Sequence, residues 1–96
     1  MTLEQLRTGQ RESILRIAAR RGAKNVRVFG SVARGQSDEM SDIDFLVEME
    51  PGRTLFDLSG LLADLETLLQ HPVDVVTEKG LRPRIRERVL AEAVPL

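Results

Sequence analysis

The segment from Gly30 to Asp44 limits the fold of this chain more than any other part of its sequence. It begins with a Gly-Ser pair directly after the apolar run Val26–Phe29, and it ends with two aspartates on either side of Ile43. A Gly-Ser pair at the end of a strand can offer backbone N–H groups and a hydroxyl to an anion. Residues two apart on a strand point to the same face, so Asp42 and Asp44 are expected to project side by side. Together these elements predict one site for a polyphosphate and its metal.

Composition narrows the class of protein. With 96 residues, 42% of them hydrophobic, residues 1–96 are expected to form a single small domain. Fourteen basic and fifteen acidic residues give a net charge of −1, and the only aromatic residues are three phenylalanines, so direct nucleic-acid binding is not expected. The chain has no cysteine and no apolar run long enough for a membrane span or a secretory signal. We therefore expect a cytoplasmic protein without disulfides, thiolate metal sites or membrane contact.

The apolar pattern predicts alternating helices and strands. A first helix should begin at a capping box formed by Thr2 and Gln5 and end before Gly22, with Gly9 weakening it. Leucines keep helical spacing over residues 55–69, which makes this the most regular helix. Short helices are also expected over 32–35 and 83–93, and strands over 26–29, 42–48 and 73–76. The sequence thus predicts an α/β (α+β) fold with a small mixed β-sheet and helices mainly on one side.

The three aspartates of the predicted strands suggest metal-dependent chemistry on a phosphate. Attack on the α-phosphate of a nucleoside triphosphate builds negative charge on the attacking and leaving oxygens, and two divalent cations can stabilise both ends of that displacement. Asp42 and Asp44 supply the hard oxygen ligands that Mg²⁺ prefers. Asp74 interrupts an apolar strand of valines, where an unpaired carboxylate would be costly to bury without a cation beside it. We expect these carboxylates to hold two Mg²⁺ ions and their mutual repulsion to raise at least one of their pKa values.

The Gly-Ser turn supplies the complementary half of the site. Ser31 and the nearby amides are expected to hold the β- and γ-phosphates, and Gly30 to permit a close backbone approach. Arg34 is a candidate to neutralise the triphosphate, with an ordinary surface ion pair as the alternative. Taken alone, the turn fits a simple helix cap as well, and only its combination with the carboxylates favours a phosphate site.

Two further features stay outside the predicted site. His71 follows the predicted helix 55–69 and precedes Pro72, so we interpret it as a helix-end residue. A dense basic run near the C-terminus is typical of a solvated helix face, with a docking face for an acidic partner as the alternative. Its members are Arg82, Arg84, Arg86 and Arg88, with Glu78, Glu87 and Glu92 nearby.

The order of these motifs resembles the nucleotidyltransferase fold of the DNA polymerase beta superfamily. The pattern Gly-Ser-x-x-Arg-Gly leading into Ser-Asp-x-Asp, here within Gly30 to Asp44, is most similar to the minimal nucleotidyltransferase branch. The resemblance covers nearly the entire chain. It implies ATP as substrate, Asp42, Asp44 and Asp74 as catalytic and metal-binding residues, and Asp74 as a possible acceptor of the incoming hydroxyl's proton.

The same resemblance implies a partner. Minimal nucleotidyltransferases are typically encoded beside a helical HEPT-domain protein, and they resemble the antitoxin of a toxin–antitoxin pair. The implied reaction transfers AMP from ATP to a tyrosine of the HEPT toxin within a hetero-oligomer. Two alternatives remain open: a non-catalytic antitoxin that neutralises its partner by complex formation, and a small-molecule nucleotidyltransferase of the kind that modifies aminoglycosides. Metal-dependent ATP consumption would discriminate against the first, and the lack of an extra substrate domain argues against the second.

Overall fold

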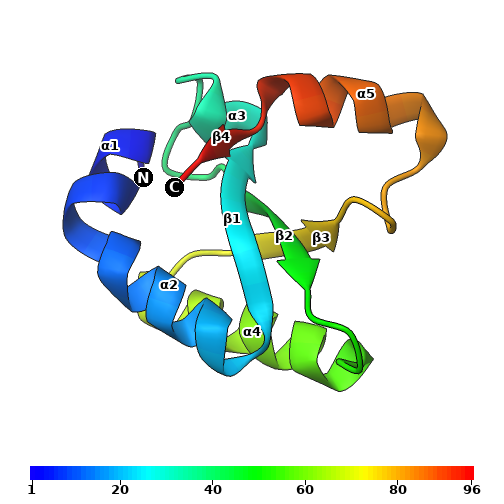
Figure 1. The fold of residues 1–96 in the computed structure, drawn as a ribbon. Coiled ribbons are helices and arrows are strands. Elements are labelled where there is room, and N and C mark those ends of the chain that lie inside the picture. The colour runs from blue at the N-terminus through cyan, green and yellow to red at the C-terminus, as the bar shows by residue number, and fades with distance from the viewer.

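The computed structural model describes all residues, Met1–Leu96, as a four-stranded sheet with helices on both faces (Figure 1). The strands are β1 (Ala23–Phe29), β2 (Ile43–Met49), β3 (Val73–Thr77) and β4 (Val94–Pro95), in the spatial order β3-β2-β1-β4. Strand β1 is antiparallel to both β2 and β4, whereas β2 and β3 are parallel. The predicted α/β class with a small mixed sheet is therefore confirmed.

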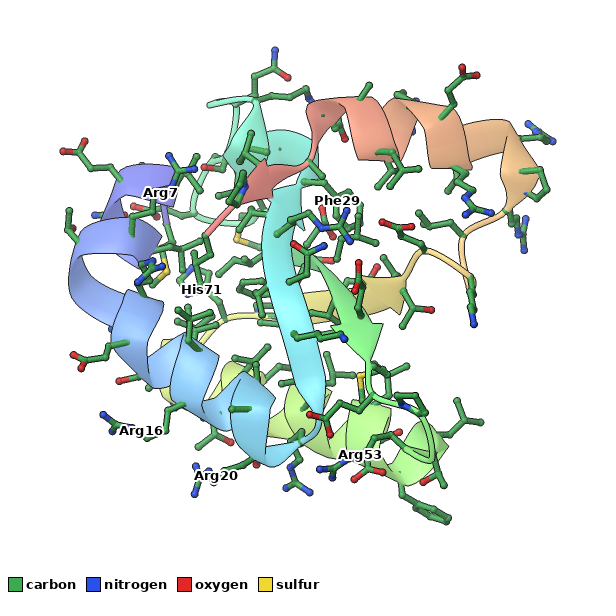
Figure 2. The ribbon with its side chains drawn as sticks, viewed as in Figure 1. Arg7, Arg16, Arg20, Phe29, Arg53 and His71 are labelled. Atoms are coloured by element: carbon green, nitrogen blue, oxygen red, sulfur yellow. The ribbon has the colours of Figure 1, made fainter.

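One face of the sheet carries the main core. Alternate residues of β2 point into it and are fully buried, namely Ile43, Phe45 and Val47. Helices α2 (Arg11–Arg20) and α4 (Leu55–Leu69) cover this face and complete a cluster of 16 buried residues. An ion pair of 2.8 Å between Arg21 Nε and Asp64 Oδ2 joins the end of α2 to α4. Arg16 and Arg20 point away from the core into solvent (Figure 2).

Helix α4 has the predicted bounds. The Thr54 hydroxyl accepts the Phe56 N–H and opens the helix, and Gln70 closes it in the left-handed conformation with φ of 54°. Its buried residues are Leu61, Leu65 and Leu69. Leu55, expected to continue the apolar stripe, is instead 79% exposed, because the first turn of α4 extends past the sheet (Figure 1).

The predicted first helix is divided into three segments. These are α1 (Leu3–Gln5), a π-helical segment η1 (Leu6–Gln10) and α2. The capping box is present: the Gln5 N–H donates to Thr2 Oγ1 at 3.1 Å, and the Thr2 N–H donates to Gln5 Oε1 at 2.8 Å. The π-helical segment contains Gly9, the residue that weakens the prediction of a continuous helix.

The second face of the sheet is covered sparsely. Helix α5 (Pro83–Glu92) contributes one buried residue, Val89, which packs with Leu46 and Leu81 in a cluster of three. Beneath α5, Arg27 Nη1 donates to Glu78 Oε1 at 2.9 Å. Most helical cover therefore lies on the opposite face, as predicted, while α5 crosses this one. None of the helices combines the length and apolarity needed to span a membrane.

Strand β4 is absent from the sequence prediction, because its two residues are too few to give a pattern. Val94 pairs with Val28 and places the C-terminal end of the chain at the edge of the sheet. Arg7 in η1 donates to the Pro95 carbonyl, and Arg11 Nε donates to the Leu96 carbonyl at 3.2 Å. The two termini consequently lie side by side (Figure 1), and α5 is tethered at its C-terminal end.

Candidate active site

The sheet register brings the Gly-Ser turn and two of the aspartates together. Phe29, the last residue of β1, lies opposite Asp44 on β2, and Asp44 lies opposite Asp74 on β3. Neighbouring strands are about 4.8 Å apart, and paired residues point to the same face. The prediction that the two carboxylate strands are neighbours is confirmed, and Asp44 lies between the turn and Asp74.

Gly30 is required at its position by both conformation and space. Its φ is +74°, a region that residues with a side chain rarely adopt. A Cβ atom at Gly30 would lie 2.1 Å from Asp44 Oδ2. The Gly30 backbone thus lies close to the carboxylate of Asp44, and its close approach to a phosphate stays a prediction.

Asp44 is half-buried in a concentration of negative charge. Burial, followed by the charges of Asp74, Asp42 and Glu92, raises the pKa of its carboxyl to about 6. The nearby guanidinium of Arg34 acts in the opposite direction. The expected rise of one carboxyl pKa is confirmed, with burial rather than repulsion as the larger cause. A bound cation would offset the neighbouring negative charges and stabilise the ionised form of this carboxyl.

Asp42 lies one residue before β2 rather than inside the strand as predicted, and it is exposed. A turn positions it: Asp38 Oδ1 accepts the Met40 N–H at 2.8 Å, and the Asp38 N–H donates to Ser41 Oγ at 3.0 Å. The chain therefore enters β2 from an organised turn that presents Asp42 next to Asp44.

Asp74 is also exposed, so the expectation that it would be buried among valines is wrong. The alternate residues Val73 and Val75 are buried against α4, but β3 is an edge strand and its other face is open beside Asp74. Solvation accounts for a carboxylate at this position without a metal. Exposure also makes Asp74 accessible, because an incoming group can reach it from solvent.

The carboxylate side chains of this site are of the chemical type that binds magnesium. No three His, Cys, Asp or Glu side chains are grouped closely enough to hold a metal ion by themselves. Mg²⁺ seldom uses such all-protein cages: it keeps several waters and is held by one or two carboxylates together with substrate phosphates. Asp44 and Asp74 face the same side of adjacent strands, and Asp42 precedes Asp44 by two residues. These carboxylates are suited to share cations with a bound triphosphate.

The Gly-Ser turn opens the short helix α3 (Gly30–Ala33), two residues earlier than predicted, and Arg34 follows it. Arg34 Nη1 lies 3.0 Å from Glu92 Oε2, and Arg34 Nε donates to Gln36 Oε1 at 3.0 Å. The Gly30 N–H donates to Glu92 Oε1 at 3.1 Å. Arg34 thus forms the ion pair considered as its alternative role, and it does so next to Asp44.

Glu92 is the residue that sequence reasoning missed. Its sequence context groups it with the solvated face of the C-terminal helix, yet only 18% of its side chain is exposed. Its partner Gly30 is 62 positions away, so no local pattern signals the contact. An isolated acid at the end of a basic helix, just before the apolar C-terminal residues, is the only hint that the sequence contains.

The remaining candidates lie away from this site. His71, labelled in Figure 2, has its Nδ1 3.4 Å from the Leu69 carbonyl at the end of α4. It lines a hollow with Gln5 and Thr8 of the N-terminal helical segment. This agrees with its interpretation as a helix-end residue. The basic run of α5 is entirely exposed, and none of its arginines forms an ion pair. These are Arg82, Arg84, Arg86 and Arg88.

The fold and the site define a nucleotidyltransferase. The nucleotidyltransferase domain family matches residues 11–96, which contain every site residue described above, and the chain belongs to this family. A solved structure of a minimal nucleotidyltransferase is 57% identical in sequence and superposes with a TM-score of 0.87, covering 100% of this chain and 97% of that chain. The resemblance drawn from the motifs is therefore confirmed, and the protein is an enzyme of this class.

Relatives indicate a more particular group. MJ0435 of Methanocaldococcus jannaschii, named as a protein adenylyltransferase, is 42% identical over 84 residues, which are 88% of this chain and 90% of the relative. Protein adenylyltransferase MntA of Thermococcus cleftensis is 37% identical over 99 residues, covering 98% of this chain and 95% of the relative. A toxin–antitoxin structure with AMP-PNP is 19% identical with a TM-score of 0.76, covering 90% of this chain and 71% of that chain, and it shares the fold.

Proposed function

We propose that this protein is an adenylyltransferase antitoxin that transfers AMP from ATP to a tyrosine hydroxyl of a HEPT-domain toxin. The observation that carries the proposal is the convergence of the Gly30 turn, Asp44 and Asp74 at one end of the sheet. The names of MJ0435 and MntA support protein as the acceptor and AMP as the group transferred. The toxin–antitoxin structure with AMP-PNP supports an ATP-like nucleotide and a toxin partner.

The turn and the carboxylates have separate tasks in this reaction. Ser31 Oγ and the amides of α3 that follow Gly30 would hold the β- and γ-phosphates, since the Gly30 N–H already donates to Glu92. Arg34 would add a positive charge from a nitrogen, Nη2, that makes no hydrogen bond within the protein. Asp42, Asp44 and Asp74 would hold Mg²⁺ ions, which supply charge stabilisation to the attacking and leaving oxygens. The α-phosphate is thereby fixed between the two groups of residues.

The chemical step forms one bond and breaks one. The tyrosine oxygen bonds to the α-phosphorus, and the bond from that phosphorus to the bridging oxygen of the leaving pyrophosphate breaks. The hydroxyl proton passes to a carboxylate oxygen of Asp74, which is exposed at the edge strand where an acceptor protein can approach. Arg34 would hold the leaving pyrophosphate through the same contact that it makes to the bound triphosphate.

Arg84 and Arg88 lie four residues apart on an exposed side of α5 that is suited to bind the partner. Neither arginine takes part in an ion pair of the structure, and Ile85 and Leu90 are 37% and 36% exposed on the same helix. Long-range attraction to an acidic surface would steer the partner toward the site that α5 borders. The resulting assembly is a hetero-oligomer.

A rescue experiment in cells tests the proposal. Cells that express the HEPT-domain toxin are supplied with the wild type, with the double variant Asp42→Asn and Asp44→Asn, or with the control Glu39→Gln from the same exposed loop. Wild type and control should restore growth, while the double variant should bind the toxin in a pull-down and fail to protect. Equal protection by the double variant, with an unmodified toxin, would instead assign the protein to the non-catalytic, complex-forming antitoxins.

A further inference from the structure

Glu92 connects the C-terminal helix to the Gly-Ser turn through both of its carboxylate oxygens. Oε1 accepts the Gly30 N–H at 3.1 Å, and Oε2 lies 3.0 Å from Arg34 Nη1. The side chain is mostly buried, with 18% exposed, whereas Glu87 on the same helix is exposed and forms no ion pair. Glu92 therefore differs from the other acid of this helix in its surroundings and its contacts.

These contacts orient the Arg34 side chain but do not use all of its N–H donors. Gln36 takes the Nε–H and Glu92 takes one Nη1–H, so Nη2 makes no hydrogen bond within the protein. An arginine side chain that is 45% exposed would otherwise sample many rotamers, and each immobilised long side chain costs conformational entropy on binding. Glu92 supplies that ordering in advance and leaves the N–H groups of Nη2 free for an anion.

Glu92 is itself held at a fixed place in the fold. It lies in the last turn of α5, where the Ala93 N–H donates to the Val89 carbonyl at 2.9 Å and Val89 is buried against Leu46. The following residues form β4, which pairs with β1. The carboxylate that orients the turn is thus anchored to the sheet that carries Asp44.

We infer that Glu92 is a positioning residue for nucleotide binding: it holds Arg34 and the Gly30 turn in the arrangement that receives the β- and γ-phosphates. This inference rests on the proposed function. The C-terminal end of α5 would then contribute to nucleotide binding, because a shift of this helix would displace the Glu92 carboxylate and release Arg34.

The variant Glu92→Gln separates the two contacts. Its amide oxygen can still accept the Gly30 N–H, but the negative charge that orients Arg34 is removed. We expect the KM for ATP in AMP transfer to rise about 10-fold, the order expected for loss of a charge-assisted hydrogen bond, with kcat within about threefold of wild type. Glu87→Gln is the matched control and should leave both constants unchanged, and thermal unfolding verifies that both variants are folded.

A double-mutant cycle distinguishes positioning from a general structural effect. In the Arg34→Gln background, Glu92→Gln should raise the KM no further, because the group through which it acts is gone. The inference is overturned by an unchanged KM in Glu92→Gln, by an equal rise in the Arg34→Gln background, or by a lower KM, which would make Glu92 a competitor of phosphate. A wild type that transfers no AMP contradicts the proposed function itself, whereas normal wild-type transfer with an unaffected Glu92→Gln contradicts this inference alone.

Discussion

The two faces of the sheet show how one small chain separates stability from chemistry. The side of the sheet covered by α2 and α4 holds a cluster of 16 buried residues from strands and helices, whereas the side beneath α5 has a cluster of three. The second face also holds the half-buried Asp44, the exposed Asp74 and the ion pair of Arg27 with Glu78. An incomplete cover is what allows charged groups and substrates to meet there, and the fuller core opposite must compensate for the stability that is lost.

Strand β2 contains both functions in alternate residues. Phe45 points into the main core and is fully buried, while Asp44 and Leu46 face the other side. Leu46 lies under α5 and Asp44 lies just beyond its cover, next to Gly30. The position of α5 thus determines which residues on this side of β2 are buried in a core and which are available to the candidate site.

The largest effect on activity is expected from the open face. Replacing Asp42 and Asp44 together by Asn should reduce AMP transfer by about 1,000-fold or more, because the carboxylates that stabilise charge at the reacting phosphate are removed. The melting temperature should not fall, since the change relieves repulsion around Asp44. Transfer is measured with labelled ATP, and Glu39→Gln serves as control. Retained transfer in the double variant would exclude this carboxylate mechanism.

A pair of leucine truncations compares the two faces in stability. Leu61 in the main core and Leu46 in the small cluster are both fully buried. Leu61→Ala should cost about 4 kcal/mol of unfolding free energy, and Leu46→Ala about 2 kcal/mol, because the thin cluster under α5 can relax or admit water. Urea unfolding gives both values. Per folded molecule, Leu46→Ala should nevertheless reduce AMP transfer more than Leu61→Ala does. The reverse order would contradict the assignment of stability to one face of the sheet and of chemistry to the other.

Regular periodicity explains why much of the fold was predictable. Helix α4 and strands β1 to β3 follow from apolar spacing and capping, and the predicted bounds differ by a few residues at most. What the sequence could not reveal depends on tertiary placement: β4 is too short for a pattern, and the exposure of Leu55 depends on where the sheet stops. The exposure of Asp74 likewise depends on β3 being an edge strand, which its composition does not show.

Some residues of the candidate site could likewise be predicted from local sequence, and others could not. Gly30, Asp42 and Asp44 lie close in sequence, and the spacing of their motif is enough to indicate a common site. The neighbouring position of Asp74 follows from a parallel crossover through α4. Glu92 reaches the turn from 62 residues away, and a contact of that separation leaves no trace in local spacing.

A change of pH tests the electrostatic difference between the faces. The pKa of Asp44 is about 6 in the folded protein, compared with an ordinary value of 3.8. Between these values the folded state retains a proton that the unfolded state releases, so stability from this group is present below pH 4 and is lost as the pH rises past 6. Asp44→Asn should therefore match wild type at about pH 4 and exceed it by about 1 kcal/mol at about pH 7.5, allowing for partial solvent screening. A gap that widens toward low pH would contradict this assignment.

A smaller effect is expected from the surface charges of the two helical layers. Charge reversal at Arg84 and Arg88 on α5 should slow association with the HEPT-domain partner by about 10-fold at low salt, and added salt should diminish the difference. The same reversal at Arg16 and Arg20, which are exposed on α2, is the matched control (Figure 2). Stopped-flow mixing measures both rates. If the control slows association equally, net charge rather than the α5 face governs the encounter.

The intact mass of the partner tests the central claim most directly. The HEPT-domain toxin is incubated with this protein, ATP and Mg²⁺, and its mass is recorded with the wild type and with the Asp42→Asn and Asp44→Asn double variant. Transfer of AMP predicts an increase of about 329 Da per group with the wild type, located on a tyrosine by fragmentation, and no increase with the double variant. An unchanged toxin mass with the wild type, in a mixture where the two proteins form a complex, would contradict the account.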